Sequence, residues 1–489
     1  MAMLAKKRTP LFYVNLFIGL FLMFVGGRLL EPIYPLTEVG MQVSGVFLGV
    51  IWLWVSVGFL WPSLLALVAF ALTDFGTIGQ VLTMSFGGSV PVLLLFSFIL
   101  FGSPQHVGAT KYITRFFLTR RILNGRPIVF AFIFIFATYM LSVAVNVTPA
   151  LVLMWAVLYG ILKELNYTKG EKFTSLMLVG TFLGAISGQA SLPFTGSTLA
   201  ILSVFNTAAE MTMPVPQYMV LGFIYSVLIF VVYCLFMKVV LTKADLEKAN
   251  SVNVELFNRD PLPPMSALQK ANFSSMLLFV FLMLLPWFIP DSWFITQWLN
   301  TLGATGLAIF LTAVMCMIQV KGEPILDFKA VAPKSINWDV FIMVCAAMAI
   351  ASALTNPATG VLDMMVVIFE PVLGGHSPFM FYLVMLLVGI FVTSFASSMV
   401  IGIALMPVLV VFALQAGANL AAIAATTTLL LHYSIILPSA SVFAAMLWSN
   451  DEWITPREVF KYGAFLVVAA TIAAIFIIRP IASVLFAGF

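Results

Sequence analysis

Charged side chains are scarce in this chain. Lys and Arg number 23 and Asp and Glu number 19 among 489 residues, so 9% of the chain is charged while 62% is apolar. Soluble globular proteins carry about 25% charged residues, which excludes a soluble enzyme of this size. The apolar residues recur in runs near the roughly 20 residues that span a bilayer. The composition therefore predicts an all-α polytopic membrane protein.

Cysteine and clustered metal ligands are scarce as well. Cys234, Cys316 and Cys345 lie in apolar runs without Cys-x-x-Cys spacing, which indicates small buried hydrophobes rather than a disulfide framework. A membrane-embedded enzyme would need a catalytic or metal-binding cluster of His, Asp or Glu, and the sequence offers none. We therefore expect a protein that is not an enzyme and has no covalent cofactor.

Two apolar blocks, 127–165 and 379–413, have polar centres and decide the topology. If each enters the membrane and returns to the same face, all basic residues except Arg28 and Arg479 fall on the inner side, which is 21 of the 23. This predicts a multi-pass protein of the cell (inner) membrane with a cytoplasmic N-terminus and an extracytoplasmic C-terminus. The eleven predicted spans are 10–30, 44–59, 62–73, 81–102, 174–205, 217–237, 273–289, 303–320, 337–355, 419–448 and 462–485.

The chain also contains an internal repeat. Pro216 and Pro456 each precede an amphipathic turn, a Gly and an apolar span, and Leu-Pro pairs at Pro193 and Pro438 lie upstream of them. The copies start on opposite faces, which is typical of the inverted repeats of secondary transporters. The predicted layout is N-terminal scaffold spans (1–80), a first repeat (81–240), a cytoplasmic loop (241–272), linking spans (273–320) and a second repeat (322–487). Each repeat holds a re-entrant hairpin, 127–165 or 379–413, and a broken helix, 174–205 or 419–448.

Polar residues interrupt both hairpins and both broken helices near mid-depth. The four interruptions are 141–149, 191–198, 392–399 and 437–441, and none contains Asp, Glu, Lys or Arg. Helix N-termini at such breaks suit anionic oxygens, while C-terminal ends and unwound carbonyls suit a cation. The missing carboxylates argue against a carboxylate proton relay. Any charge in the site should then belong to the bound ligands.

Two further segments allow more than one interpretation. His432 lies just before the second Leu-Pro break and is either a packing histidine bonded to a neighbour or a group that handles protons. The basic and aromatic segment 111–121 indicates a helix lying in the inner membrane interface.

These features resemble the divalent-anion/sodium symporters, carriers of succinate, citrate and sulfate within the ion-transporter superfamily, over about residues 40–487. In that family each hairpin tip carries Ser-Asn-Thr and each following span breaks at a Thr/Ser-Pro-Pro-Asn-like loop. Asn146 and Ser397 keep the tip motif, whereas Val147 and Met399 replace its threonines and Ser398 its second Asn. The family is a dimeric elevator whose tips and loops bind sodium and substrate.

The resemblance implies residues for both ligands. Residues expected at the substrate are Asn146, Val147, Thr148, Thr195, Gly196, Ser197, Ser398, Met399, Ser441 and Val442. Residues expected at sodium are Val145, Asn146, Phe194, Thr393, Ala396, Ser397, Ser398 and Ala440. Because Val147 and Met399 lack hydroxyl donors, we expect a substrate with a larger apolar or ring portion than succinate, or with a single carboxylate.

The sequence thus predicts a secondary carrier of an organic anion of the carboxylate class, coupled to sodium and acting as a homodimer in the bilayer by an elevator mechanism, with no nucleic-acid partner. A sodium-independent anion exchanger of the same fold is the alternative, since the second tip lacks its Asn. An anion channel is disfavoured because breaks near the midplane build an occluded site better than a pore.

Overall fold

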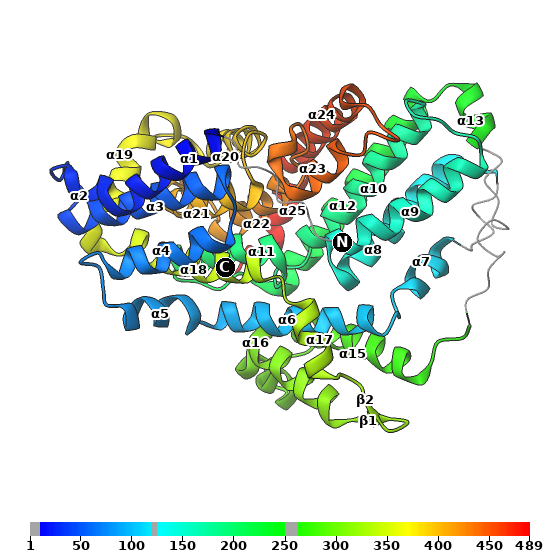
Figure 1. Cartoon of the computed structure of the whole chain (residues 1–489), viewed down its shortest axis with the longest axis horizontal. Helices are drawn as coiled ribbons and strands as arrows, with labels where there is room; N and C mark the ends of the chain where they lie inside the picture. Colours follow the sequence, from blue (N-terminus) through cyan, green and yellow to red (C-terminus); the bar gives the residue numbers. More distant parts are fainter. Residues whose placement is uncertain (1–9, 119–124, 250–262) are drawn as a thin grey trace.

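The computed structural model describes residues 10–118, 125–249 and 263–489 (Figure 1). Six of the basic residues used for the orientation, Lys6, Lys7, Arg8, Arg120, Arg121 and Arg259, lie outside the described residues. The described chain is helical except for a two-stranded antiparallel hairpin, β1 (Gln319–Val320) and β2 (Glu323–Pro324). The all-α fold class predicted from the composition is confirmed.

The first half of the chain runs from the N-terminal spans through the first repeat. The N-terminal helices are α1 (Pro10–Phe21), η1 (Leu22–Gly26), α2 (Gly27–Leu29), α3 (Glu38–Ser56), α4 (Leu60–Ala71), α5 (Ile78–Phe86) and α6 (Ser89–His106). They are followed by α7 (Lys111–Leu118), α8 (Pro127–Val145), α9 (Val147–Glu164), α10 (Lys172–Ala190), α11 (Gly196–Ala208) and α12 (Val215–Val240). The helix α7 falls within the segment expected to lie in the membrane interface.

The second half repeats the order of hairpin, broken helix and long helix. The loop and the linking spans hold α13 (Lys243–Ala249), α15 (Ala267–Leu284), η3 (Leu285–Trp287) and α16 (Phe294–Met317), and the predicted second repeat begins with α17 (Phe328–Ser335) and α18 (Trp338–Thr355). The remaining elements are η4 (Pro357–Thr359), α19 (Val361–Leu373), α20 (Pro378–Thr393), α21 (Ser398–Gln415), α22 (Leu420–Leu431), η5 (Pro438–Ala440), α23 (Val442–Trp448), α24 (Pro456–Ala473), η6 (Ala474–Ile478) and α25 (Arg479–Leu485).

Twelve of the described helices are long and apolar enough to cross a membrane, or thirteen if the bent pair α19 and α20 is counted. This number differs from the eleven predicted spans because it includes α8, α9 and α21, which lie in the two predicted hairpins, and leaves out the shorter helices α4 and α22, which lie in the predicted spans 62–73 and 419–448. α19 and α20 meet at 102°. The helix α19 has no counterpart among the predicted spans, and the predicted loop 241–272 contains α13 and the start of α15.

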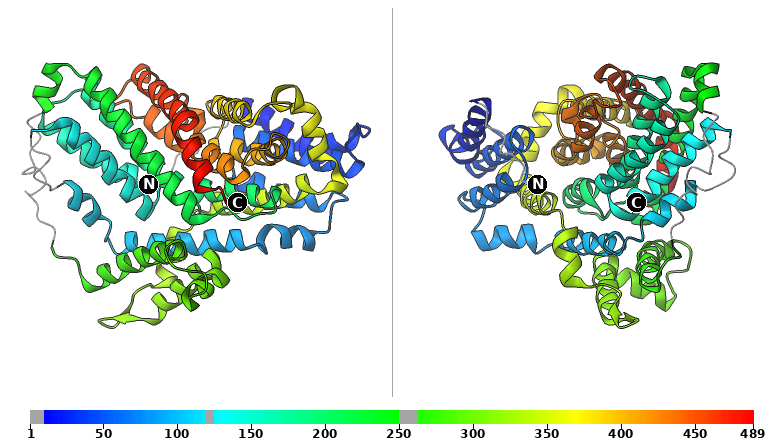
Figure 2. Two further views of the ribbon diagram at one scale, coloured as in Figure 1. Left: turned by 180° about the vertical axis from the view of Figure 1, so that it is seen from behind. Right: turned by 45° about the vertical axis from the view of Figure 1, so that its right-hand side comes forward.

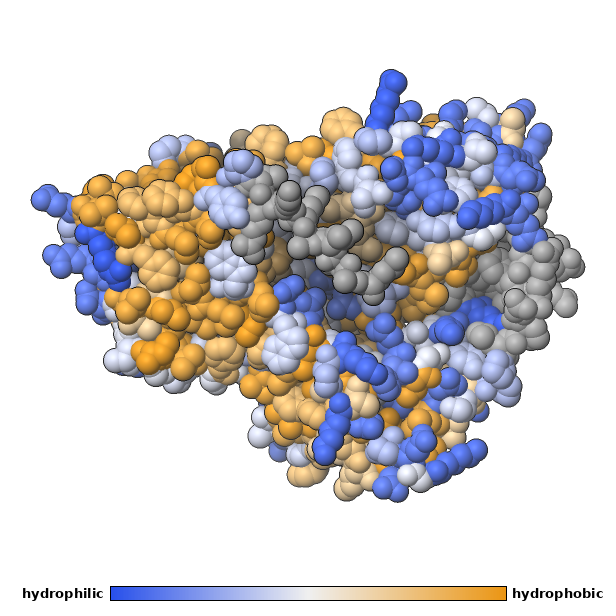
Figure 3. Space-filling model, viewed as in Figure 1, coloured by the Kyte–Doolittle hydropathy of each residue, from blue (hydrophilic) through white to orange (hydrophobic). Residues whose placement is uncertain are grey.

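Large apolar side chains are exposed on part of the surface. Large apolar residues such as Phe17, Leu48 and Trp52 on α1 and α3 are exposed. In Figure 3 apolar surface covers the left part of the molecule, where α1 to α4 lie, and hydrophilic residues gather on the right around α13. An exposed apolar face of this kind is suited to lipid.

The two repeats pack against each other around the broken helices. α11 contacts α21, and α10 contacts both α23 and α24. On the other side of this core, α15, α16, α17 and the β-hairpin gather beside α6 (Figures 1 and 2). Every residue of α10 from Phe173 to Ala190 is buried, so the first broken helix lies at the centre of the molecule.

Glycines explain how α8 comes so close to α10. Gly180, Gly184 and Gly188 recur every four residues along one face of α10, and α8 packs on that face. A Cβ on Gly184 would lie 2.3 Å from the carbonyl oxygen of Ile135, and a Cβ on Gly188 would lie 2.7 Å from that of Tyr139. Small residues at this spacing let helix backbones approach within a membrane. The first hairpin is thereby packed directly on the broken helix that follows it.

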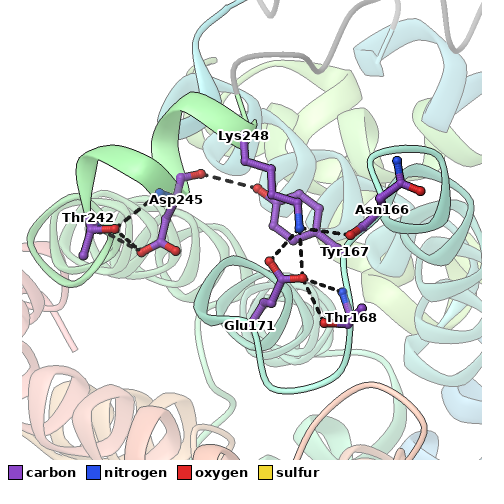
Figure 4. A network of polar contacts seen from close by, with 7 residues as sticks. All are labelled: Asn166, Tyr167, Thr168, Glu171, Thr242, Asp245 and Lys248. Atoms are coloured by element: carbon purple, nitrogen blue, oxygen red, sulfur yellow. Dashed lines mark hydrogen bonds and ion pairs between the residues drawn. The ribbon is translucent and has the colours of Figure 1, made fainter.

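A polar network fastens the connection between α9 and α10 to α13 (Figure 4). The Lys248 Nζ donates to Glu171 Oε2 at 2.8 Å and to the carbonyl of Asn166 at 2.9 Å, and it lies 4.1 Å from the ring centroid of Tyr167. Lys172 and Asp245 form a looser ion pair, with 3.9 Å between their nitrogen and oxygen. Partial burial raises the pKa of Glu171, but the hydrogen bonds from Lys248 and Thr168 outweigh it and hold that pKa below its ordinary value.

This network should make stability depend on pH. Because the pKa of Glu171 is lowered in the folded state, its stabilising effect is present above the ordinary carboxyl pKa and is lost as the pH falls through the folded pKa. We expect Glu171→Gln to reduce the free energy of unfolding by about 0.5–1 kcal/mol at neutral pH, since the pair is partly exposed. Thermal unfolding in detergent measures this, and the difference from wild type should shrink as the pH falls below the ordinary carboxyl pKa and disappear once Glu171 is protonated in the folded protein.

Glu247→Gln on the same helix α13 is the matched control, because Glu247 is exposed and takes no part in this network. Equal losses of stability in both variants would contradict the role assigned to Glu171.

Candidate functional site

A cavity of about 750 Å³ lies where the two hairpin tips and the two helix breaks meet. The first repeat contributes the tip around Asn146 and the break around Ser197, and the second repeat contributes Ser397 and Ser441. The opposite wall comes from outside the repeats' hairpins and broken helices, and includes Trp54 on α3 and Phe98 on α6. Four interruptions that lie far apart in sequence therefore line a common space.

Asn146 forms the tip of the first hairpin in an unusual backbone conformation. Its φ of 104° and ψ of 162° fall in a region that only glycine adopts easily. Its Oδ1 accepts the backbone N–H of Val147 at 2.7 Å, which caps the start of α9. Such strain costs on the order of 1–3 kcal/mol and is typical of functional sites. The side chain thus has a structural role at the same position where the sequence predicts ligand binding.

The second tip is an unwound segment between α20 and α21. Ser397 takes an extended backbone conformation and makes no side-chain capping bond, so its hydroxyl is not used to close the helix. Thr393, one turn earlier, donates its hydroxyl to the carbonyls of Gly389 and Ile390 in its own helix. The two tips therefore differ. The Asn146 side chain caps the helix that follows the first tip, whereas no side chain caps the helix that follows the second.

Within the described part of the chain, four helices of at least thirteen residues begin at the cavity. α18 begins at its exposed rim, and α9, α11 and α21 begin at the tips and the first break, where their first residues include Thr148, Gly196 and Ser398. Helix N-termini present free N–H groups and a partial positive charge, and they bind anionic oxygens without any charged side chain. The start of α23 is capped by the Ser441 hydroxyl, which accepts from the Ala444 N–H at 3.0 Å.

A directed chain of hydrogen bonds runs behind the start of α11. His432 Nδ1 lies 2.8 Å from the carbonyl of Thr428, so this nitrogen carries a proton, and Nε2 lies 2.9 Å from Ser197 Oγ. The Thr198 hydroxyl donates to the carbonyl of Gln189, which leaves the Ser197 hydroxyl to donate to a neutral His432. Ser197 in turn accepts from Gln189 Nε2 at 3.0 Å. Both imidazole nitrogens are therefore occupied, as expected of a packing histidine.

The Gln189 amide ends this chain at the cavity wall. Its Oε1 is buried and has no hydrogen-bond partner among the described residues, although the side chain lines the cavity. The amide fits there because position 196 is glycine: a Cβ on Gly196 would lie 2.4 Å from Gln189 Nε2. A buried acceptor without a partner costs about 1–3 kcal/mol. Gln189 is thus held beside the start of α11 at an energetic cost.

The cavity includes most of the residues expected at the substrate. Asn146, Thr148, Thr195, Gly196, Ser197, Ser398, Met399, Ser441 and Val442 line it, as do Val145 and Ser397 from the expected sodium sites. Val147, Phe194, Thr393, Ala396 and Ala440 lie outside the lining. Phe194 instead stacks on Phe101 of α6, with 5.7 Å between the ring centroids.

Several lining residues are absent from the sequence-based prediction. Gln189 and Ser97 bring buried polar groups that have no partner within the described ranges, and Lys334 and Asp339 bring charge. Gln189 lies only two residues before the predicted break, and a Gln in an otherwise apolar and small-residue span was the available signal. Lys334 lies in the last turn of α17 and Asp339 in the first turn of α18, and no local pattern relates either to the tips.

The fold and this neutral, helix-end site are those of a membrane transporter. The family model of citrate transporters, CitMHS, matches residues 48–430, which is well over half of the chain. The chain belongs to this family of carboxylate carriers and is not an enzyme. The predicted carboxylate class is thereby confirmed, while membership of the divalent-anion/sodium symporters in particular stays a prediction. No curated protein sequence matches the chain.

Replacing Asn146 by glycine separates its structural role from ligand binding. Glycine suits the backbone conformation at this position but removes Oδ1. We expect Asn146→Gly to retain folded protein with near-normal thermal stability and to lose transport at least about tenfold, because each lost ligand contact of 1.4 kcal/mol is a factor of 10. Uptake into proteoliposomes measures transport. Wild-type uptake by this variant would mean that Oδ1 takes no part in binding.

Gln189→Met offers a second test of the site. Met removes a buried acceptor that lacks a partner among the described residues, but also the hydrogen bond that Gln189 Nε2 donates to Ser197, so the two effects offset each other and we expect thermal stability to change little. If the amide contributes to the bound state, the same variant should transport at least about tenfold more slowly. Thr174→Val, which removes a buried hydroxyl without a partner outside the cavity lining, is the control and should transport normally.

Proposed function

We propose that this chain is a sodium-coupled secondary carrier that moves a citrate-like carboxylate through the cavity between its two hairpin tips. The observation that carries the proposal is that α9, α11 and α21 all begin at this cavity while its inner wall has no charged side chain. The carboxylates of the substrate lie at these N-termini. Sodium lies at the unwound carbonyls and tip side chains of Asn146 and Ser397 and neutralises part of the anion's charge.

The two hairpins and broken helices act as the mobile part of an elevator in a homodimer. Contacts between α11 and α21 and between α10 and α23 support this view, because they join the hairpins and breaks of both repeats into one body. The spans α3 and α6, which form the opposite wall, belong to the stationary scaffold. The start of α18 lines the cavity on the same side.

A sodium-independent exchanger is the second candidate, and the second tip favours it. Ser398 stands where the resembling family has Asn, and the Thr393 hydroxyl is bonded within its own helix rather than lining the cavity. A cation site there would have few ligands. Met399 and Val147 also leave the site poorer in hydroxyl donors, so substrates with fewer carboxylates or a larger apolar part belong in any test.

Uptake into liposomes separates these candidates. Purified protein should accumulate labelled citrate against a gradient when sodium is higher outside, and accumulation should stop when an ionophore collapses the sodium gradient. Succinate and an aromatic monocarboxylate complete the panel, and a proton gradient without sodium is the matched condition. Uptake that needs no sodium but requires trapped internal anion would favour the exchanger. Failure to move any carboxylate under all conditions would overturn the proposal.

A further inference from the structure

Two charged side chains lie at one end of the otherwise neutral cavity. They are Lys334, in the last turn of α17, and Asp339, in the first turn of α18. Both are exposed, as are the lining residues Gln105 and Asn337, whereas Ser197 is half-buried and Ser398 is buried. Thr148, Ser439 and Val442, from the tips and breaks, are exposed lining residues as well. The rim at Lys334 and Asp339 is therefore a polar, solvent-exposed mouth of the cavity.

The backbone that carries Lys334 is fixed against the scaffold. Ser335 packs so closely on α6 that a Cβ on Gly102 would lie 2.0 Å from its hydroxyl oxygen. The connection to α18 is short and is capped by Asn337, whose side chain accepts from the N–H of Val340 at 3.2 Å. The charge of Lys334 thus stays at the mouth although its side chain is long.

Helix stability explains only part of this arrangement. A lysine in the last turn of a helix and an aspartate in the first turn both complement the helix dipole. Helix stability alone does not require either to line a cavity. The ion pairs found in the described ranges, Lys172 with Asp245 and Lys248 with Glu171, involve neither residue. Lys334 is the cation that lines the cavity within the described part of the chain.

We propose that Lys334 draws the anion into the cavity from the face of the protein that carries α17, and that Asp339 opposes it. This rests on the proposed function, since it needs an anionic substrate. A charge at a mouth with low-dielectric walls raises the local concentration of opposite ions and the rate of association. The charge at the mouth acts before the substrate reaches the helix N-termini. It therefore changes the rate of substrate binding and not the rate of translocation.

The proposed attraction has three consequences that a purely structural role of Lys334 would not have. The effect grows with the charge of the substrate, because it is Coulombic. It weakens with added salt, since the screening length is about 8 Å at 0.15 M ionic strength. It is one-sided, because the mouth is on the α17 face.

Transport in right-side-out and inverted membrane vesicles tests all three. At low ionic strength Lys334→Gln should raise the KM for citrate about three- to tenfold from one face only, with the maximal rate unchanged. The effect should be smaller for a monocarboxylate and should fade in 0.5 M salt. Asp339→Asn should lower the KM from the same face.

Lys334→Arg, which keeps the charge, and Lys329→Gln, an exposed lysine on the same helix outside the cavity lining, are the controls and should behave like wild type. An equal change in Lys329→Gln, or a loss in Lys334→Gln that is independent of salt and equal from both faces, would overturn the inference. Wild-type vesicles that transport no carboxylate would instead overturn the proposed function itself, and the inference with it.

Discussion

The constraint on which this structure depends is that backbone polar groups cannot be left unpaired in lipid. Each unwound segment at membrane depth must face protein, water or ligand. The tips around Asn146 and Ser397 and the breaks around Thr195 and Ser441 meet this requirement by gathering at one cavity. The completely buried helix α10 and the close packing of α8 upon it keep these segments away from lipid.

The scarcity of charged side chains has a related physical cause. A charged side chain at the tips would need a partner inside the membrane, and an anion would then meet either repulsion or a permanent ion pair. Helix N-termini give a positive potential without that cost. The charges that do line the cavity, Lys334 and Asp339, lie at its exposed mouth. If the protein works as proposed, attraction of the anion, in water, is separate from its recognition, inside the protein.

Much of this arrangement was predictable because it depends on residue patterns that are local in the sequence. A polar centre in an apolar block predicted both hairpins, and Leu-Pro pairs predicted both broken helices, since proline and small polar residues interrupt a helix wherever they occur. Asn146 and Ser397 were predicted at the tips because the tips resemble a known motif, and the structure places both on the cavity. The boundaries of the hairpin arms agree with the structure to within a few residues.

Other features could not be predicted because tertiary contacts create them. Gln189 is held at the cavity by its bond to Ser197 and fits in the space left by Gly196. Lys334 is positioned by the contact between Ser335 and Gly102. The helix α19 escaped prediction because it combines Asp363 and Glu370 with exposed Val367 and Ile368, a mixture that resembles neither a span nor a loop. Distance along the chain carries no information about such neighbours.

The glycine face of α10 has a mechanical consequence. With the carbonyls of Ile135 and Tyr139 seated over Gly184 and Gly188, α8 cannot slide along α10 by a fraction of a turn without driving backbone into backbone. The helices α8 and α10 therefore form one rigid unit. The first hairpin is thus joined through α8 to the broken helix that follows it, and any displacement of one carries the other with it.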